Sequence, residues 1–189
     1  MTATTVKSTK VTALFDTAPP TLQEVKGQGG VLRVVSDFIA AATTSLDEVA
    51  DKILLLPVHS SNVLHDLVLY NDDLHTGGTS GAIDVGLYNG PVAFIDTDAS
   101  KTKYAAYQVL DVDAFASAIT TLTAANTAGV SVRFESNSNS GDMENLNKPV
   151  WQALGLDSDP NKMFVIGITV TTQMTTPAAG SIALRAHIS

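Results

Sequence analysis

The sequence predicts a mainly β protein, an antiparallel, jelly-roll-like β-sandwich with one or two short helices and an extended N-terminal arm. Two observations carry this prediction. Six or more stretches alternate apolar and polar side chains with the two-residue period of a strand, and they follow one another at short spacing. The strand–helix–strand rhythm of a parallel sheet is missing from the sequence. Two packed antiparallel sheets bury one face of each such strand.

Length and composition set the outer bounds. The 189 residues suit one domain with a buried core, and 44% hydrophobic with 16% charged residues is typical of a folded chain. The absence of cysteine excludes disulfides, thiol chemistry and cysteine zinc sites. No signal-peptide pattern and no run of about 18 apolar residues occurs, so we expect no membrane partner.

The charge is negative overall and unevenly distributed. The net charge is −8, while residues 1–33 carry +2 and the remaining residues carry −10. A nucleic-acid-binding surface requires clustered basic residues, so this balance argues against a nucleic-acid partner.

The first 26 residues are predicted to be an extended arm, and residues 27–189 are predicted to be the β-sandwich domain. The arm is rich in Thr, Pro and Gly and is too polar to fold alone. It nevertheless combines basic and apolar side chains, which makes it a candidate partner contact. These side chains are Lys7, Lys10, Val11, Leu14 and Phe15. The alternative is an ordinary flexible terminus.

The first strands are predicted from Val31 onward, where apolar and polar positions alternate. Ser45 and Glu48 have the spacing of a capping box, which favours a helix start. Residues 52–58 instead favour a buried strand that ends at Pro57.

The middle of the chain predicts further strands. Residues 62–70 are apolar and extended, and a polar, Gly-rich loop at 71–81 leads to a strand, turn and strand at 82–96. Asn89-Gly90-Pro91 provides the turn.

Two short helices are predicted. The first lies within 111–129, where three apolar side chains are spaced i, i+4 and i+7 behind a capping aspartate; they are Phe115, Ile119 and Leu122, with Asp111 or Asp113 as the cap. The second is "NKPVWQALG", with Pro149 in its first turn and Gly155 past its end. Its Trp151 is expected to fill one edge of the core.

The C-terminal region predicts a long antiparallel hairpin with one buried face. The even-numbered positions of 164–170 and of 182–188 are apolar, and "TTPAAG" separates the two stretches.

The segment that begins at Asp157 partly matches a calcium-binding loop. Asp157, Asp159 and Asn161 match the opening of an EF-hand loop, but Lys162 stands where Gly is required and Ile168 where Glu is required. The sequence therefore favours a capped turn before the last two strands.

Other constellations also fail to form a site. The spacings of His59, His65 and His75 match no zinc-ligand pair. The aspartate pairs 96/98 and 111/113 share a strand face, as solvated surface acids commonly do. "GGTSG" at 77–81 lacks the lysine of a phosphate loop and the register of a nucleophile elbow. We therefore predict no enzyme, no catalytic, cofactor-binding or metal residues and no cofactor.

Five motifs in a fixed order, within residues 29–188, resemble capsid decoration, or cement, proteins of tailed bacteriophages. They are a leucine-rich strand ended by Pro57, the strand "DVGLY", the expected helix "DAFASA", the segment "VWQALGL", and the Thr-rich C-terminal region with "AAG". All five are packing motifs rather than catalytic ones.

The resemblance implies a virion structural protein on the capsid exterior. Its partner would be the assembled shell of the major capsid protein, which it would stabilise, and lattice symmetry would favour a homo-oligomer, a trimer or a dimer. The alternative is a receptor- or glycan-binding β-sandwich of a virion fibre. That class would be expected to show aromatic platforms, and only 6% of the residues are aromatic.

Overall fold

The computed structural model describes residues 32–43, 46–78, 80–91, 93–95, 103–133, 145 and 147–189. Eight strands build two sheets: β1 (Arg33–Ala41), β2 (Lys52–His59), β3 (Leu64–Asn71), β4 (Ala82–Asn89), β7 (Val109–Ile119), β8 (Asn126–Ser131), β9 (Met163–Thr172) and β10 (Gly180–Ile188). The remaining elements are β5 (Phe94–Ile95), β6 (Lys103–Tyr104), the 3-10 helix η2 (Thr121–Thr123) and the helix α3 (Val150–Ala153).

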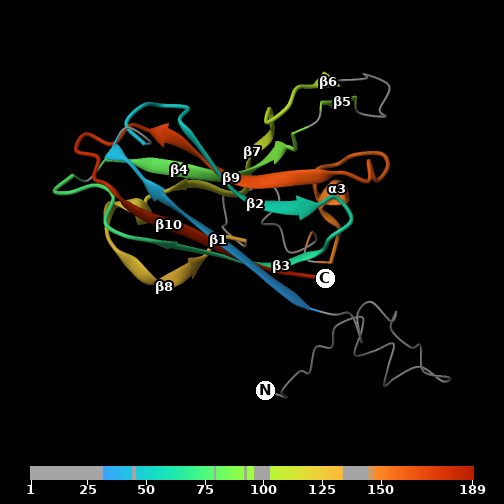
Figure 1. Ribbon diagram of the computed structural model, residues 1–189, viewed down its shortest axis with the longest axis horizontal. Coiled ribbons are helices and arrows are strands. Elements are labelled where there is room, and N and C mark those ends of the chain that lie inside the picture. The colour runs from blue at the N-terminus through green and yellow to red at the C-terminus, as the bar shows by residue number, and fades with distance from the viewer. Residues whose placement is uncertain are drawn as a thin grey trace, which may run out of the picture. The chain divides into compact units, whose positions relative to one another are not determined.

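The strands pair in a nested order. Sheet A has the order β1-β10-β3-β8, and sheet B has the order β2-β9-β4-β7, with every neighbouring pair antiparallel. The first strand thus pairs with the last, the second with the next to last, and so on inward, as in a jelly roll. The two sheets lie face to face, and β5 and β6 form a separate ribbon (Figure 1). The predicted jelly-roll-like sandwich is confirmed.

Strands β9 and β10 bury the predicted face but do not form the predicted hairpin. Their even-numbered side chains are all buried; these are Phe164, Ile166, Ile168, Val170, Ile182, Leu184, Ala186 and Ile188. The chain crosses to the other sheet between the two strands, because β9 already lies between β2 and β4, and β10 between β1 and β3. Alternation reveals which face is buried, not which strand is the neighbour.

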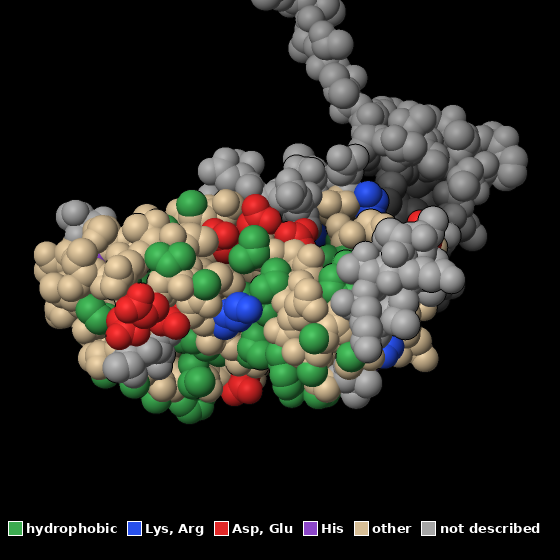
Figure 2. All heavy atoms as spheres, turned by 90° about the horizontal axis from the view of Figure 1, so that it is seen from above, with side chains coloured by type: hydrophobic (Ala, Val, Ile, Leu, Met, Phe, Trp, Pro, Cys, Tyr) green, Lys and Arg blue, Asp and Glu red, His purple; other side chains and the backbone are tan. Residues whose placement is uncertain are grey.

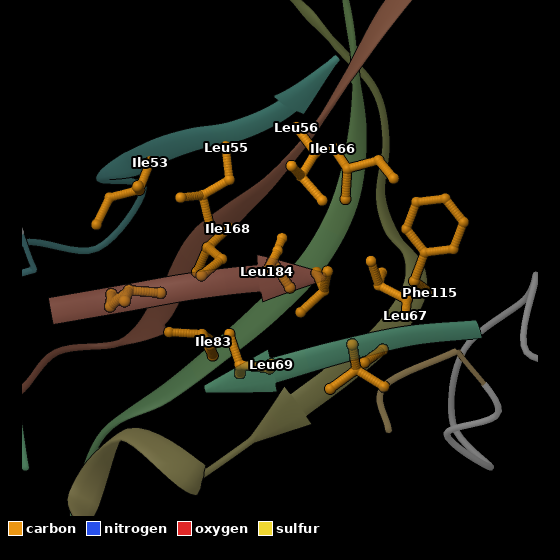
Figure 3. Packing of buried hydrophobic residues seen from close by; sticks show 14 of the residues in the cluster. Ile53, Leu55, Leu56, Leu67, Leu69, Ile83, Phe115, Ile166, Ile168 and Leu184 are labelled. Carbon is orange, nitrogen blue, oxygen red and sulfur yellow. The ribbon is translucent and has the colours of Figure 1, made fainter. Parts of the chain in front are cut away.

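The core lies between the two inner faces. Figure 3 shows side chains from both sheets meeting in this space, including Leu67 and Leu69 of β3 and Ile166 and Ile168 of β9. Strand β2 contributes the consecutive residues Leu55 and Leu56, although neighbours in a regular strand point to opposite faces. A register shift between Leu54 and Leu56 in the pairing with β9 explains this, because a bulge realigns the side chains.

The helix predicted within 111–129 is wrong, because strand β7 and the turn η2 occupy that region. Strand β7 pairs irregularly with β4: Leu87 lies opposite Asp111, but Val85 lies opposite Ala116. The extra residues of β7 bulge and interrupt the two-residue period. Buried side chains then recur at the spacing of a helix; they are Phe115, Ile119 and Leu122.

Helix α3 confirms the second helix prediction. Pro149 is its N-cap residue, and Gly155 follows its end at φ +73°, in the left-handed region that favours glycine. Val150 is the buried residue of this helix, whereas Trp151 is only half-buried. The expectation that Trp151 fills the core edge is therefore wrong.

Several predicted boundaries change. Ser45 lies outside the described residues, and 46–50 form bends and turns rather than a helix. Strand β2 continues past Pro57, which pairs with Val165; this is tolerated because β2 is an edge strand. Strand β4 ends at Asn89 as predicted, but β5 pairs with β6 instead of returning along β4.

The inner face of β9 provides a test of this core. We predict that Ile166→Asp, which places a charge at a fully buried position, lowers the free energy of unfolding by on the order of 4 kcal/mol. The control Thr172→Asp lies on the same strand at an exposed position and should change it little. Chemical denaturation measures both variants, and an unchanged midpoint for Ile166→Asp would show that the inward face is assigned wrongly.

Candidate interaction surface

The outer face of sheet B is covered by the chain's own residues. Gly86 and Gly167 lie opposite each other in β4 and β9. A Cβ atom at Gly86 would lie 2.2 Å from the carbonyl oxygen of Val112, and one at Gly167 would lie 2.9 Å from the Tyr88 ring. The glycines therefore allow β7 backbone and the Tyr88 side chain to pack directly on this sheet. The Tyr88 hydroxyl group also hydrogen-bonds with Thr169.

This packing buries Asp84 of β4 and half-buries Asp111 and Asp113 of β7. Asp84 accepts a hydrogen bond from the N–H of Ala118 at 2.7 Å, and burial raises its pKa, with Asp113 adding a like charge. Burial also raises the pKa of Asp111 to about 6, and its neighbour Asp113 contributes to the rise. The sequence prediction that Asp111 and Asp113 are ordinary solvated acids is wrong, because both side chains are half-buried. The bulge of β7 places the backbone of residues 111 and 112 directly over Gly86.

The raised pKa of Asp111 predicts a pH-dependent stability. A carboxyl group whose pKa is higher in the folded state favours folding when protonated, so the free energy of unfolding should rise as the pH falls through about 6. Asp111→Asn should raise stability at pH 7.5 and flatten this rise. Thermal melts from pH 5 to 8 measure the stability of the wild type and of Asp111→Asn. Asp157→Asn, at an exposed loop position, is the control. Equal pH dependence in wild type and Asp111→Asn would contradict the assignment.

The three histidines considered for zinc are engaged separately. His59 Nδ1 lies 2.8 Å from Ser61 Oγ, and His65 Nε2 lies 2.8 Å from Ser189 Oγ. His75 is buried, with Nε2 3.2 Å from Thr175 Oγ1. Among the residues that the structure describes, no group of three or more His, Cys, Asp or Glu could hold a metal ion.

The segment from Asp157 to Asn161 is a capped turn, as predicted. One oxygen of Asp159 accepts hydrogen bonds from the Ser60 hydroxyl group at 2.5 Å and from the N–H of Asn161 at 2.8 Å. Ser60 Oγ in turn accepts the N–H of Lys162 at 3.0 Å. These bonds fasten the end of β2 to the start of β9, so the carboxylate has a structural partner.

A small cavity lies beside α3. It is lined by residues from β3, β4, β7, the helix and the segment after β8, among them Leu64, Leu87, Phe115, Arg133 and Val150, and has a volume of about 10 Å³. This space accommodates about one water molecule, which is too little for a substrate.

No helix within the described ranges is both long and apolar enough to span a bilayer.

The exposed apolar side chains concentrate on β1, at the edge of sheet A. Val34 is 59% exposed and Phe38 is 69% exposed, and Ile39 is also exposed. Alternation had predicted the strand correctly, but it could not show that β1 lies at an edge where neither face is fully covered. On the side of the molecule shown in Figure 2, acidic side chains form separate groups among hydrophobic ones, and few basic side chains are visible.

The other candidate residues belong to segments outside the described part of the chain. Lys7, Lys10, Val11, Leu14 and Phe15 of the predicted arm lie outside the described residues. The aspartate pair 96/98 lies outside them as well.

Comparison with solved structures identifies two chains of similar fold. A chain from the capsid of Ralstonia phage GP4 matches with a TM-score of 0.54 and 21% sequence identity, over 84% of this chain and 84% of that chain. A chain from the capsid asymmetric unit of cyanophage Pam1 matches with a TM-score of 0.53 and 17% identity, over the same shares. No protein-family model and no curated protein matches the sequence. At these identities the likeness establishes a shared fold.

Proposed function

We propose that the chain is a virion structural protein that binds the outer surface of an assembled phage capsid shell and stabilises it, as a decoration or cement protein does. The observation that carries this proposal is the fold shared with chains from two phage capsids, over 84% of each chain. It agrees in kind with the resemblance found in the sequence motifs.

The placement of those motifs supports a role in packing. All residues of β4, which contains "DVGLY", are buried, and "VWQALGL" forms α3 and the turn that follows it. The segment "DAFASA" lies in β7. The motifs thus build the sandwich, which favours a protein that acts through its surfaces and is not an enzyme.

The charge supports an outer location. With a net charge of −8, the chain is better suited to a solvent-facing surface than to one against packaged DNA. A protein that binds only the assembled shell of the major capsid protein stabilises the shell by mass action, in proportion to its occupancy and affinity. Shell symmetry favours binding as a homo-oligomer.

The arm is proposed to supply part of the shell contact. Lys7 and Lys10 lie close in sequence to Val11, Leu14 and Phe15, so one short segment offers both charge and apolar surface. Extended chain spans about 3.3 Å per residue, so 26 residues could reach tens of ångströms to a neighbouring subunit or the shell.

Co-sedimentation with empty shells of the major capsid protein tests this function. We predict that the full chain sediments with the shells and raises their melting temperature. Deleting residues 1–26 should weaken binding strongly while leaving a cooperatively melting β protein. Lys10→Glu should weaken binding more than the control Lys26→Glu, which makes the same charge change at the end of the arm.

Two outcomes would contradict the proposal. If the purified chain assembled into closed particles by itself, it would be a shell subunit rather than a decoration protein. If it ignored shells but bound a glycan array, the fibre alternative would replace the proposal. If the chain that lacks residues 1–26 bound shells as tightly as the full chain, the contact would lie on the sandwich and not on the arm.

A further inference from the structure

The two four-stranded sheets have four edge strands within the described part of the chain, and three of these strands carry interruptions that discourage pairing. Strand β2 contains Pro57 and a register shift, and β7 shifts register three times against β4. Strand β8 contains Gly129 at φ +82° and a further shift. Such features protect sheet edges from other strands. Strand β1 lacks them: its nine residues run in unbroken register along β10.

The backbone groups of β1 alternate between β10 and the open edge. Ser181 of β10 exchanges hydrogen bonds with Asp72 on the far side, through its carbonyl oxygen at 2.9 Å and its N–H at 2.7 Å. The even-numbered residues of β10 therefore face β1 and bond to its odd-numbered residues. Val34, Ser36 and Phe38 consequently direct their N–H and C=O groups to the open edge. Consistent with this, the N–H of Phe38 donates to the side chain of Asp37 at 2.8 Å.

We propose that this edge binds β1 of a second copy of the chain, antiparallel, about a two-fold axis at Val35. In that register Val34 of each copy pairs with Ser36 of the other, and both residues direct their backbone groups across the join. Arg33 lies opposite Asp37 twice. The interface is thus self-complementary in hydrogen bonding and charge.

Charge selects this register over its neighbours. An axis at Ser36 would place Asp37 opposite Val35 and leave Arg33 opposite Ile39. An axis at Asp37 would place two carboxylates directly opposite each other, which is destabilising. Arg33 and Asp37 of the same chain are separated by about 13 Å along the strand, so they do not satisfy one another.

The side chains at the join are available in the single chain. Leu32 is 56% exposed and Phe38 is 69% exposed, and Arg33 and Asp37 are exposed as well. Phe38 lies on the outer face of the sheet, and pairing would cover part of it. The joined sheet would contain eight strands.

The absence of cysteine makes a direct test possible. A two-fold axis at Val35 brings the two copies of this residue to a Cα–Cα distance of about 4.5 Å, within the range of a disulfide. In the full chain under mild oxidation, Val35→Cys should therefore form a covalent dimer. Asp37→Cys, on the same face but about 13 Å from its own copy, should not.

Sedimentation equilibrium of the full chain gives the second readout. Asp37→Arg and Arg33→Asp should each weaken dimerisation by about tenfold or more, and the double variant Arg33→Asp/Asp37→Arg should restore it. Asp157→Arg, an exposed position with the same charge change, is the control. Unchanged thermal melts would verify folding.

Three results would overturn the proposal. They are a wild-type chain that stays monomeric up to about 100 µM, a dimer that the double charge reversal fails to restore, and cross-linking at residue 37 equal to that at residue 35. With a thiol–amine cross-linker, efficient joining of Val35→Cys to Lys7 or Lys10 of the other copy would identify residues 1–26 as the occupant instead. None of these results bears on shell binding by the chain.

Discussion

The whole structure depends on pairing strands that are far apart in the sequence. Strand β1 pairs with β10, β2 with β9, β3 with β8 and β4 with β7, and successive pairs belong to alternate sheets. Consecutive strands such as β9 and β10 therefore face each other across the core instead of sharing hydrogen bonds. Ile166 and Ile168 of one sheet meet Leu184 of the other for this reason (Figure 3). Non-local pairing of this kind carries a large loop-closure cost, and the buried inner faces offset it.

The two sheets use their outer faces differently. On sheet B, the paired glycines Gly86 and Gly167 allow the bulge of β7 and the Tyr88 ring to pack directly on the outer face. The chain itself therefore covers this part of the face. The same packing holds Asp111 in surroundings that raise its pKa. On sheet A, β1 leaves Val34 and Phe38 exposed beside an open edge. The exposed large apolar side chains of the described strands therefore concentrate on β1 of sheet A.

Sequence patterns predicted burial better than they predicted pairing. The alternation in 164–170 and 182–188 identified every inward side chain, and Pro149 with Gly155 correctly bracketed α3. The hairpin was wrong because alternation is a property of one strand and carries no information about its neighbour. The helix within 111–129 was wrong because the irregular strand β7 and the turn η2 that follows it together placed buried side chains at the spacing of a helix.

The candidate site was less predictable than the fold. The turn at Asp159 could be recognised because its hydrogen bonds are local, apart from that to Ser60. The raised pKa of Asp111 has burial as its first cause, and the strand pattern did not show that the bulge of β7 packs this segment over Gly86; only the contribution of Asp113 is local in the sequence. The openness of β1 depends on its place in the sheet, which a strand pattern does not report. The predicted arm contact remains a proposal, because its residues lie outside the described part of the chain.

The proposed role can be tested most directly by cryo-electron microscopy of virions that contain the protein. The account predicts density for an eight-stranded sandwich on the outer surface of the shell, seated on the major capsid protein and absent from particles assembled without this chain. Density for the sandwich within the continuous shell wall, on the inner surface against DNA, or at the tip of a fibre would contradict it.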